Sequence, residues 1–307
     1  MSDETAKKPD SALFSPAPAA DIDFPVSTYS TNLSRLYMGM IRWQWHDEIE
    51  ITLVKSGRAL LCLSDRNILL TSGEGFFLNQ NQLHSIRSTD KEMCLLHTVK
   101  FHPSFLFGYG KTNMSAKYLT PILSSAFLHC LILKAQDDST KEMLRLAEDT
   151  FSCCLEKKYG YELAVKSLLC YFWNLLLPFA APQDGALPES PQVSTDSARI
   201  KQAILFIEKK YMEPLTLEEI AASIHVSKSE CCRCFQRALG LTPFEYLIKF
   251  RIFESTRKIM RGEEAAGSIS TLAASVGFNS TSYYNKLFKK YLNCTPTEYK
   301  KSIQKQT

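Results

Sequence analysis

Two histidines and a glutamate in the first third of the chain have the side-chain chemistry of a binding site. His46 and Glu50 are separated by three residues, and His84 follows further along the chain. Imidazole and carboxylate groups are good ligands for zinc, iron or nickel. The same groups can also form hydrogen bonds with a small polar molecule. These residues therefore predict either a metal site or a ligand-binding site, provided that the fold brings them together.

The residues just before His46 favour a ligand-binding pocket. Alternation along a strand from Met38 to His46 places Arg42, Gln44 and His46 on the same face. An arginine on such a face suits a carboxylate or a phosphate group. An internal hydrogen-bond network without any ligand is the simpler alternative, and the sequence leaves it open. The candidate effector-binding residues are Arg42, Gln44, His46, Glu50 and His84.

The elements that must position these residues have the pattern of short antiparallel strands. Between residues 36 and 101, apolar runs are separated by turn residues such as Ser56-Gly57 and Gly73-Glu74-Gly75. Closely spaced strands of this kind are typical of an antiparallel β-barrel or jelly roll. The predicted barrel covers residues 34–103.

Motif spacing in this region resembles the paired motifs of cupins. The first motif contains His46-x3-Glu50, and the second runs from Gly73 to His84. Metal-binding cupins carry two histidines and a glutamate in the first motif, whereas this chain has Gln44 where the first histidine would stand. Because one metal ligand is lost, we expect neither a metal nor another cofactor.

The ten cysteines do not form a disulfide framework, and no secretory signal precedes them. We therefore expect free thiols in a reducing, cytoplasmic environment. Cys231, Cys232 and Cys234 lie close together, but their spacing lacks the paired CxxC knuckles of a zinc site. Core packing is the better explanation for Cys231 and Cys234. Since no apolar run reaches the ~18 residues needed to cross a bilayer, we expect no membrane association.

A pair of short helices is predicted twice in the last third of the chain. In the first copy, at about 216–239, Thr216 and Glu219 form a capping-box pattern and Ser227 can cap a second helix. The pattern recurs at about 268–291, with one additional residue in the turn. The second helix of each copy has a polar, basic outer face. A duplication of this kind rarely arises by chance, so we interpret it as a doubled helix-turn-helix.

These repeats resemble the C-terminal DNA-binding domain of AraC/XylS-type transcription regulators. The resemblance covers roughly residues 199–303 of a predicted domain at 198–303, and it is strongest in AASVGFNSTSYYNKLFKKYLNCTPTEYKK. The second copy has Asn293 where the first has Gly240, and asparagine also tolerates the left-handed conformation at a helix C-terminus. The resemblance implies binding to double-stranded DNA, with the second helix of each copy in a major groove.

The resemblance also implies which side chains contact DNA. Arg233 suits bidentate pairing with guanine, and Asn285 suits adenine. Other cationic residues suit phosphates, which give affinity but no sequence preference. The predicted base-contacting residues are Ser229, Cys232, Arg233, Thr281, Ser282, Asn285 and Lys286. The predicted phosphate-contacting residues are Lys228, Arg237, Lys289 and Lys290.

The predicted fold class is α+β with several domains. Residues 1–33 are rich in serine, proline and alanine and predict a mostly disordered lead-in, with a short edge strand near Phe24-Pro25-Val26. Residues 104–177 predict a helical hairpin, where the resemblance implies that a homodimer forms. Residues 178–197 are proline-rich and predict an interdomain linker. The barrel and this hairpin are followed by an all-α domain, in which one long helix joins the two helix-turn-helix units.

Charge is distributed unevenly along the chain, whose net charge is +4. From Asp196 to Thr307 there are 18 basic and 11 acidic residues, a net charge of +7, which leaves −3 for the remainder. A basic C-terminal third fits a module that binds phosphates. The sequence therefore predicts a cytoplasmic, non-enzymatic transcription regulator that binds double-stranded DNA and a small-molecule effector, with RNA polymerase as a candidate partner. The alternative is a metal-dependent cupin enzyme with an appended DNA-binding domain.

Overall fold

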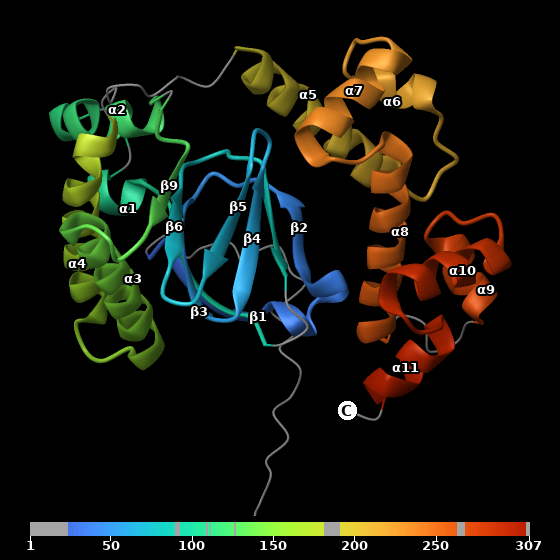
Figure 1. Ribbon diagram of the computed structural model, residues 1–307, viewed down its shortest axis with the longest axis horizontal. Coiled ribbons are helices and arrows are strands. Elements are labelled where there is room, and N and C mark those ends of the chain that lie inside the picture. Colours follow the sequence, from blue (N-terminus) through green and yellow to red (C-terminus); the bar gives the residue numbers. More distant parts are fainter. Residues whose placement is uncertain are drawn as a thin grey trace, which may run out of the picture. The chain divides into compact units, whose positions relative to one another are not determined.

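Strands occupy the N-terminal part of the chain and helices the C-terminal part, as the computed structural model shows (Figure 1). The chain divides into two compact units between Ser194 and Thr195. The first unit contains two β-sheets with helices, and the described residues of the second unit form helices only, which confirms the α+β class. The structure describes residues 24–89, 93–108, 110, 112–125, 127–180, 191–262 and 268–304.

The two sheets of the first unit are antiparallel and pack face to face. The larger sheet has the strand order β1-β8-β3-β6-β9, and the smaller has the order β2-β7-β4-β5. Val54 and Leu96 from the larger sheet and Leu61 and Ile86 from the smaller sheet share one buried apolar cluster. The larger sheet consists of β1 (Val26–Asn32), β3 (Ile49–Ser56), β6 (Gly75–Leu78), β8 (Leu95–Phe101) and β9 (Cys130–Leu133). The smaller sheet consists of β2 (Met40–Gln44), β4 (Arg58–Leu63), β5 (Asn67–Thr71) and β7 (His84–Ser88).

The sheets do not close into the predicted barrel. Among the described strands, none from one sheet pairs with a strand of the other. Strand β3 shows the reason, because Ile49, Ile51 and Leu53 pack against helices while Val54 lies between the sheets. Both faces of the larger sheet are therefore covered, and apolar packing rather than hydrogen bonding joins it to the smaller sheet. The prediction of antiparallel strands is confirmed, but the prediction of a closed barrel is wrong.

Strand β1 lies within the segment that was predicted as a mostly disordered lead-in. It pairs with β8 from Val26 opposite Phe101 to Asn32 opposite Leu95. Its serines and threonines give a weak apolar signal, but pairing with β8 satisfies its backbone. The lead-in therefore does not extend to residue 33, and residues 1–23 lie outside the described part of the chain.

Helices cover one face of the larger sheet. The predicted hairpin is formed by α3 (Asp138–Glu156) and α4 (Tyr161–Leu176), with Gly160 at φ 82° in the turn. Phe151 and Phe172 of these helices pack with Phe77 of the sheet. Strand β9 lies inside the region predicted as helical, since a run of four apolar residues can pair with a sheet edge as readily as it forms a helix. The shorter elements are α1 (Ser104–Phe107), η4 (Ser115–Leu119), α2 (Thr120–Leu123) and η5 (Leu177–Ala180).

One described stretch is longer and more apolar than we expected. Tyr161–Ala180 has a mean hydropathy of 1.5 and is 28% buried, so by length and composition alone it could cross a membrane. A single helix of this kind is weak evidence for a membrane span, because core helices of soluble proteins have the same composition. In this fold Val165 and Leu169 of the stretch lie in the apolar core.

The second unit consists of two helix-turn-helix pairs joined by a long helix (Figure 1). Thr216 and Glu219 form a complete capping box, and Ser227, Ser268 and Ser280 cap the next helices with their side chains, so the predicted helix starts are confirmed. The helices are α5 (Pro191–Lys210), α6 (Leu217–Ser223), α7 (Lys228–Leu239), α8 (Pro243–Met260), α9 (Ile269–Ser275), α10 (Thr281–Leu292) and α11 (Pro296–Gln304).

Helix α5 begins inside the segment predicted as an aperiodic linker. Its first residue is Pro191, so residues 191–197 are helical rather than irregular. Proline is well tolerated in the first turn of a helix, which explains why its presence did not exclude one here. Residues 178–180 belong to η5, and residues 181–190 lie outside the described residues.

Left-handed residues fix the turns of both copies. His225 (φ 55°) and Gly277 (φ 87°) occupy equivalent places between the two helices of each pair. A Cβ at Gly277 would lie 2.5 Å from the Tyr211 carbonyl oxygen, so this turn requires glycine. Helix α7 ends at Gly240 (φ 65°) and α10 at Asn293 (φ 57°), which confirms the predicted conformation of this asparagine.

Candidate functional site

The outer face of α7 carries the residues predicted to contact DNA in the first copy. Lys228, Ser229, Arg233 and Arg237 are exposed, and Cys232 is half-buried. The opposite face is buried and includes Cys231 and Cys234, as predicted, and all ten cysteines are free thiols. Because packing fixes the rotation of α7 about its axis, the predicted residues share one solvent-facing side.

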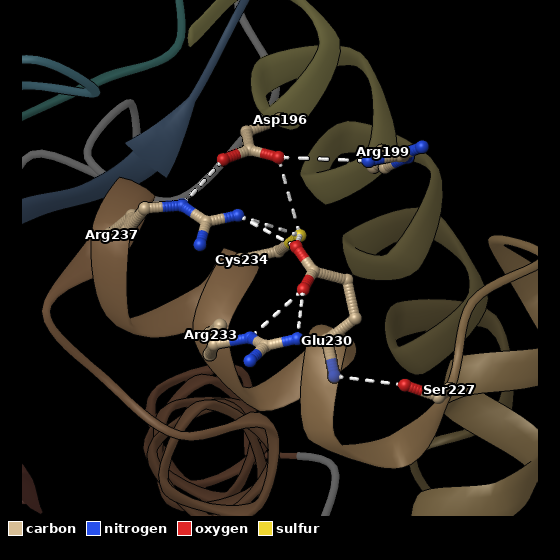
Figure 2. Close-up of polar contacts among 7 residues, drawn as sticks. All are labelled: Asp196, Arg199, Ser227, Glu230, Arg233, Cys234 and Arg237. Atoms are coloured by element: carbon tan, nitrogen blue, oxygen red, sulfur yellow. Dashed lines mark hydrogen bonds and ion pairs between the residues drawn. The ribbon is translucent and has the colours of Figure 1, made fainter. Parts of the chain in front are cut away.

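Acidic side chains hold the two arginines of α7 (Figure 2). Glu230 Oε2 lies 2.9 Å from Arg233 Nε and 2.6 Å from Arg233 Nη2. Glu230 Oε1 accepts a hydrogen bond from Arg237 Nη2 at 2.8 Å, and Arg237 Nε donates to Asp196 Oδ2 at 2.7 Å. Asp196 lies on α5, so one continuous set of contacts runs from α5 through Arg237 and Glu230 to Arg233.

The pKa values in this network keep its charges fixed near neutral pH. Hydrogen bonds from Arg237 and Arg233 lower the pKa of Glu230 to about 2. Burial and a hydrogen bond to Asp196 raise the pKa of Cys234 to about 12. The Cys234 thiol therefore stays protonated and donates to Asp196 Oδ1 at 3.3 Å.

Asp196, Glu230 and Cys234 place three potential metal ligands within 4.8 Å of one another. These groups do not fit a metal ion, because the thiol is protonated and both carboxylates are already neutralised by arginines. No local pattern points to Asp196, which is 41 residues from Arg237 along the chain. The pairing of Glu230 with Arg233 could have been found from their i,i+3 spacing in a helix.

The outer face of α10 is basic and carries no acidic residue. Its sequence is TSYYNKLFKKYL, and Ser282, Lys286, Lys289 and Lys290 are exposed. None of the three lysines has an ion-pair contact with another residue in the described part of the chain. The positive charge on this face is therefore not paired with nearby acids. On α7, by contrast, acidic side chains pair with the arginines.

Asn285 and Thr281 are less accessible than the other predicted contact residues of α10. Both side chains are half-buried. The Oδ1 atom of Asn285 is buried and accepts no hydrogen bond from the described residues. Of the predicted base-contacting residues of α10, Ser282 and Lys286 are therefore the fully exposed ones.

In the first unit, Glu50 lies at the centre of a buried polar cluster. Its Oε2 atom is 2.9 Å from His46 Nε2, 3.1 Å from Lys100 Nζ and 3.5 Å from His84 Nε2. Thr52 donates to the other carboxylate oxygen at 2.8 Å. Strands β3, β7 and β8 supply Glu50, Thr52, His84 and Lys100, whereas His46 lies in the connection between β2 and β3. The register of β3 against β8 places Lys100 opposite Glu50.

The structure brings together four of the five predicted effector-binding residues. Gln44 Nε2 lies 3.3 Å from His84 Nε2, so Gln44 joins Glu50, His46 and His84. Arg42 is half-buried on β2, two residues before Gln44. Lys100 was not predicted as part of the cluster, because only the register of β8 against β3 places it there.

The donor atoms of this cluster resemble a metal site, since His46, Glu50 and His84 offer ligands within 4.8 Å of one another. However, the Lys100 ammonium lies 3.1 Å from the shared carboxylate oxygen and would repel a divalent cation. Burial would raise the pKa of Glu50, but Lys100 and hydrogen bonds with both histidines hold it well below its ordinary value. The residues therefore fit a charge-balanced polar cluster better than a metal site.

A small hollow of about 20 Å³, partly open to solvent, lies beside this cluster. Two of its lining residues are strand partners of the cluster, because Leu63 pairs with His84 and Leu78 pairs with Glu50. Its charged residues, Asp65 and Arg66, stand in a turn between β4 and β5 that the sequence did not mark as functional. The lining consists of Leu63, Ser64, Asp65, Arg66, Leu78, Gln82, Leu83 and His129.

A sheet unit with a polar cavity and a helical unit with two polar reading helices define a DNA-binding regulator with a sensor domain. Two family models match these parts: the AraC-like ligand binding domain matches residues 38–171, and a helix-turn-helix domain matches residues 220–302. The chain belongs to the AraC family of helix-turn-helix transcriptional regulators, and the predicted resemblance is confirmed. Since this family consists of regulators, the expectation of a non-enzymatic protein is also confirmed.

Relatives match most of the chain. It is 30% identical over 281 residues to the uncharacterized HTH-type transcriptional regulator YdeC of Bacillus subtilis (strain 168), covering 91% of this chain and 93% of YdeC. It is 22% identical to the lactose operon transcription activator of Staphylococcus xylosus, covering 76% and 82% of the two chains. Among solved structures, ToxT from Vibrio cholerae matches with 15% identity and a TM-score of 0.45, covering 91% and 98%.

Proposed function

We propose that the chain is a homodimeric, cytoplasmic transcription activator that reads DNA with α7 and α10. The observation that carries this proposal is the repeated geometry of the second unit, in which two capped reading helices present polar, basic faces and are joined by one helix of 18 residues. Such a helix is ~27 Å long, which suits two reading helices in successive major-groove segments. An activating role is supported by the similarity to the lactose operon transcription activator of Staphylococcus xylosus.

In this proposal, residues at the centre of the outer faces of α7 and α10 contact the bases. We assign Ser229, Cys232 and Arg233 to bases in one groove, with Arg233 paired to guanine. We assign Ser282 and Lys286 to bases in the other groove, with Thr281 and Asn285 at the edge of the contact. Lys289 and Lys290 are available for phosphates, whereas Lys228 and Arg237 would first have to leave their acidic partners Glu218, Glu230 and Asp196.

The proposed effector site is the surface around the hollow beside the Glu50 cluster, which would have to widen to admit a molecule larger than water. Arg66 and His129 offer polar or cationic groups there, and Leu63, Leu78 and Leu83 offer apolar surface. This combination suits a small molecule with one anionic end. The cluster of Gln44, His46, Glu50 and His84 does not line the hollow but adjoins it through the strand pairs of His84 with Leu63 and of Glu50 with Leu78. The effector would act by binding one domain arrangement more tightly than another.

The helical hairpin is the proposed dimer contact. Leu155, Tyr159 and Leu163 are 73%, 109% and 76% exposed, and Tyr171 is 48% exposed. These side chains cluster around the α3–α4 turn and along α4, where apolar exposure is costly in a monomer. A self-complementary contact between two copies would cover them. A bound dimer would present paired DNA-binding units beside RNA polymerase, its proposed partner in activation.

Selection from random double-stranded DNA tests the proposal. The purified full chain should enrich fragments with two short conserved blocks about one helical turn apart, because two reading helices contact successive grooves. Sequencing of the bound fragments measures this. Enrichment of no sequence, or of a single block, would contradict the proposal.

Thermal unfolding with a panel of small carboxylates tests the effector site, and a stabilisation that is lost in Arg66→Ala is expected.

A further inference from the structure

A chain of contacts from Asp196 to Arg233 fixes the arginine side chains of α7. The described residues of α10 have no equivalent chain of contacts. We propose that Asp196 and Glu230 are positioning residues for DNA readout, which hold Arg233 in one orientation for a base and withhold Arg237 from the phosphates. The inference rests on the proposed placement of α7 in a major groove. It assigns a role in sequence recognition to an acidic residue on α5, a helix that carries none of the predicted DNA contacts.

Burial makes Asp196 the fixed end of this arrangement. The side chain of Asp196 is 6% exposed, whereas that of Arg237 is 44% exposed. A buried carboxylate that loses its partner is strongly destabilising, so Arg237 is held in place as its counterion. Arg199 Nη1 also forms an ion pair with Asp196 Oδ1, at the longer distance of 3.8 Å. Movement of Arg237 to a phosphate would break its 2.7 Å hydrogen bond to this buried carboxylate.

Glu230 transfers this order to Arg233. It contacts the Nε and Nη2 atoms of Arg233, which fixes the plane of the guanidinium. Among the described residues, Nη1 of Arg233 has no partner. The free N–H groups at this end of the guanidinium can donate to guanine O6 and N7. A side chain already held in its binding orientation loses less freedom when it binds, so discrimination between bases increases. Arg237 holds Glu230 from the other side.

The two reading helices then differ in the kind of binding that they supply. On α7, the cationic residues Lys228, Arg233 and Arg237 all have acidic partners. On α10, no lysine forms a close ion pair with a described residue, and Lys289 and Lys290 interact only at longer range with Glu298 and Glu245. Non-specific, salt-dependent affinity should therefore come mainly from α10, and the sharper base preference from α7.

The test compares the full chain with Asp196→Asn in selection from random DNA, followed by binding to the recovered site and its single-base variants at several salt concentrations. We expect preference at the base read by Arg233 to fall at least ~5-fold, because the arginine is no longer held. We also expect the slope of log affinity against log salt to steepen by about 1, because Arg237 becomes available to a phosphate. Asp196→Glu should restore both properties.

Glu254→Gln is the matched control, since Glu254 is also a largely buried acid paired with an arginine, Arg257, but lies on α8 away from the α7 network. It should leave base preference and the salt slope unchanged. The inference is overturned if Asp196→Asn lowers only affinity or thermal stability, as a purely structural residue would.

Glu230→Gln provides a second route if Asp196→Asn does not fold. It should lose preference at the same base position as Arg233→Ala, and an unchanged preference would overturn the inference. Failure of the unmodified chain to enrich any sequence would instead contradict the proposed function. The two failures are therefore distinguishable.

Discussion

The outer faces of α7 and α10 come from a duplicated sequence, yet their cationic side chains differ in whether they form ion pairs. Arg233 and Arg237 are tied to carboxylates, whereas the three lysines of α10 have no ion-pair contact with the described residues. The caps, the left-handed turns and the buried faces of the two copies agree, so the scaffold is common. The difference teaches that a repeated fold can hold one reading helix rigidly and leave the other free to adapt to phosphates.

Replacement of the lysines on α10 is expected to have the largest effect. Lys286→Gln, Lys289→Gln and Lys290→Gln together should reduce DNA affinity on the order of 100-fold near physiological salt, because two phosphate contacts and one base contact are lost. The salt slope should flatten by about 2, because two phosphates are no longer neutralised. Filter or fluorescence binding over a salt series measures both values. Lys228→Gln on α7 is the control and should change the slope less than Lys289→Gln or Lys290→Gln alone.

Removal of Arg233 tests the reading role of α7. Arg233→Ala should cost ~1–3 kcal/mol of binding free energy and relax preference at one base position, because a bidentate contact with guanine is lost. Binding to a set of single-base operator variants measures this. If all sequences bind equally less well, Arg233 contacts a phosphate, and the contrast between the two helices disappears.

The helix ends offer a smaller test of the common scaffold. Gly240→Ala should destabilise the end of α7 by ~1 kcal/mol, because alanine is strained at φ 65° although no atom lies within 4 Å of its Cβ. Gly240→Asn should cost less, since Asn293 adopts φ 57° at the equivalent place. Amide hydrogen exchange in α7 and α10 measures the local effect. An equal loss of protection in both variants would argue against backbone strain.

Titration of Glu230 should give the smallest effect. Its pKa of about 2 is below the ordinary value of 4.5, because Arg237 and Arg233 stabilise the carboxylate. The corresponding stabilisation is present above pH 4.5 and is lost as the pH falls through about 2. Base discrimination by α7 should therefore not change between pH 7 and pH 5. A carbon NMR titration of the carboxylate measures the pKa, which should rise in Arg237→Ala.

Local signals allowed the helical unit to be predicted closely. Thr216 with Glu219 marks one helix start, and Ser227 marks the next, because a cap is formed by residues only three apart. Helical periodicity also separates the buried Cys234 from the exposed Arg233 without knowledge of the rest of the fold. The same reasoning recovered α3 and α4 and the glycine between them.

Tertiary structure alone decided the features that depend on residues far apart in the chain. Register between β3 and β8 places Lys100 against Glu50 and so favours a charge-balanced cluster over a metal site. Packing of helices on one face of the larger sheet prevents closure into a barrel and recruits β9 as its edge strand. Neither result follows from local pattern, since an apolar run does not reveal which surface will cover it.

The doubled helix-turn-helix unit and its family could be recognised from the sequence alone. Both depend on caps, turns and apolar spacing between residues that are close together in the chain. The three-dimensional fold decided which charges on that unit are available, because Asp196 reaches Arg237 only after α5 packs beside α7. Electrostatic pairing depends on distance in space rather than along the chain. For that reason the sequence allows a prediction of which residues contact DNA, but it does not reveal the acids that pair with them.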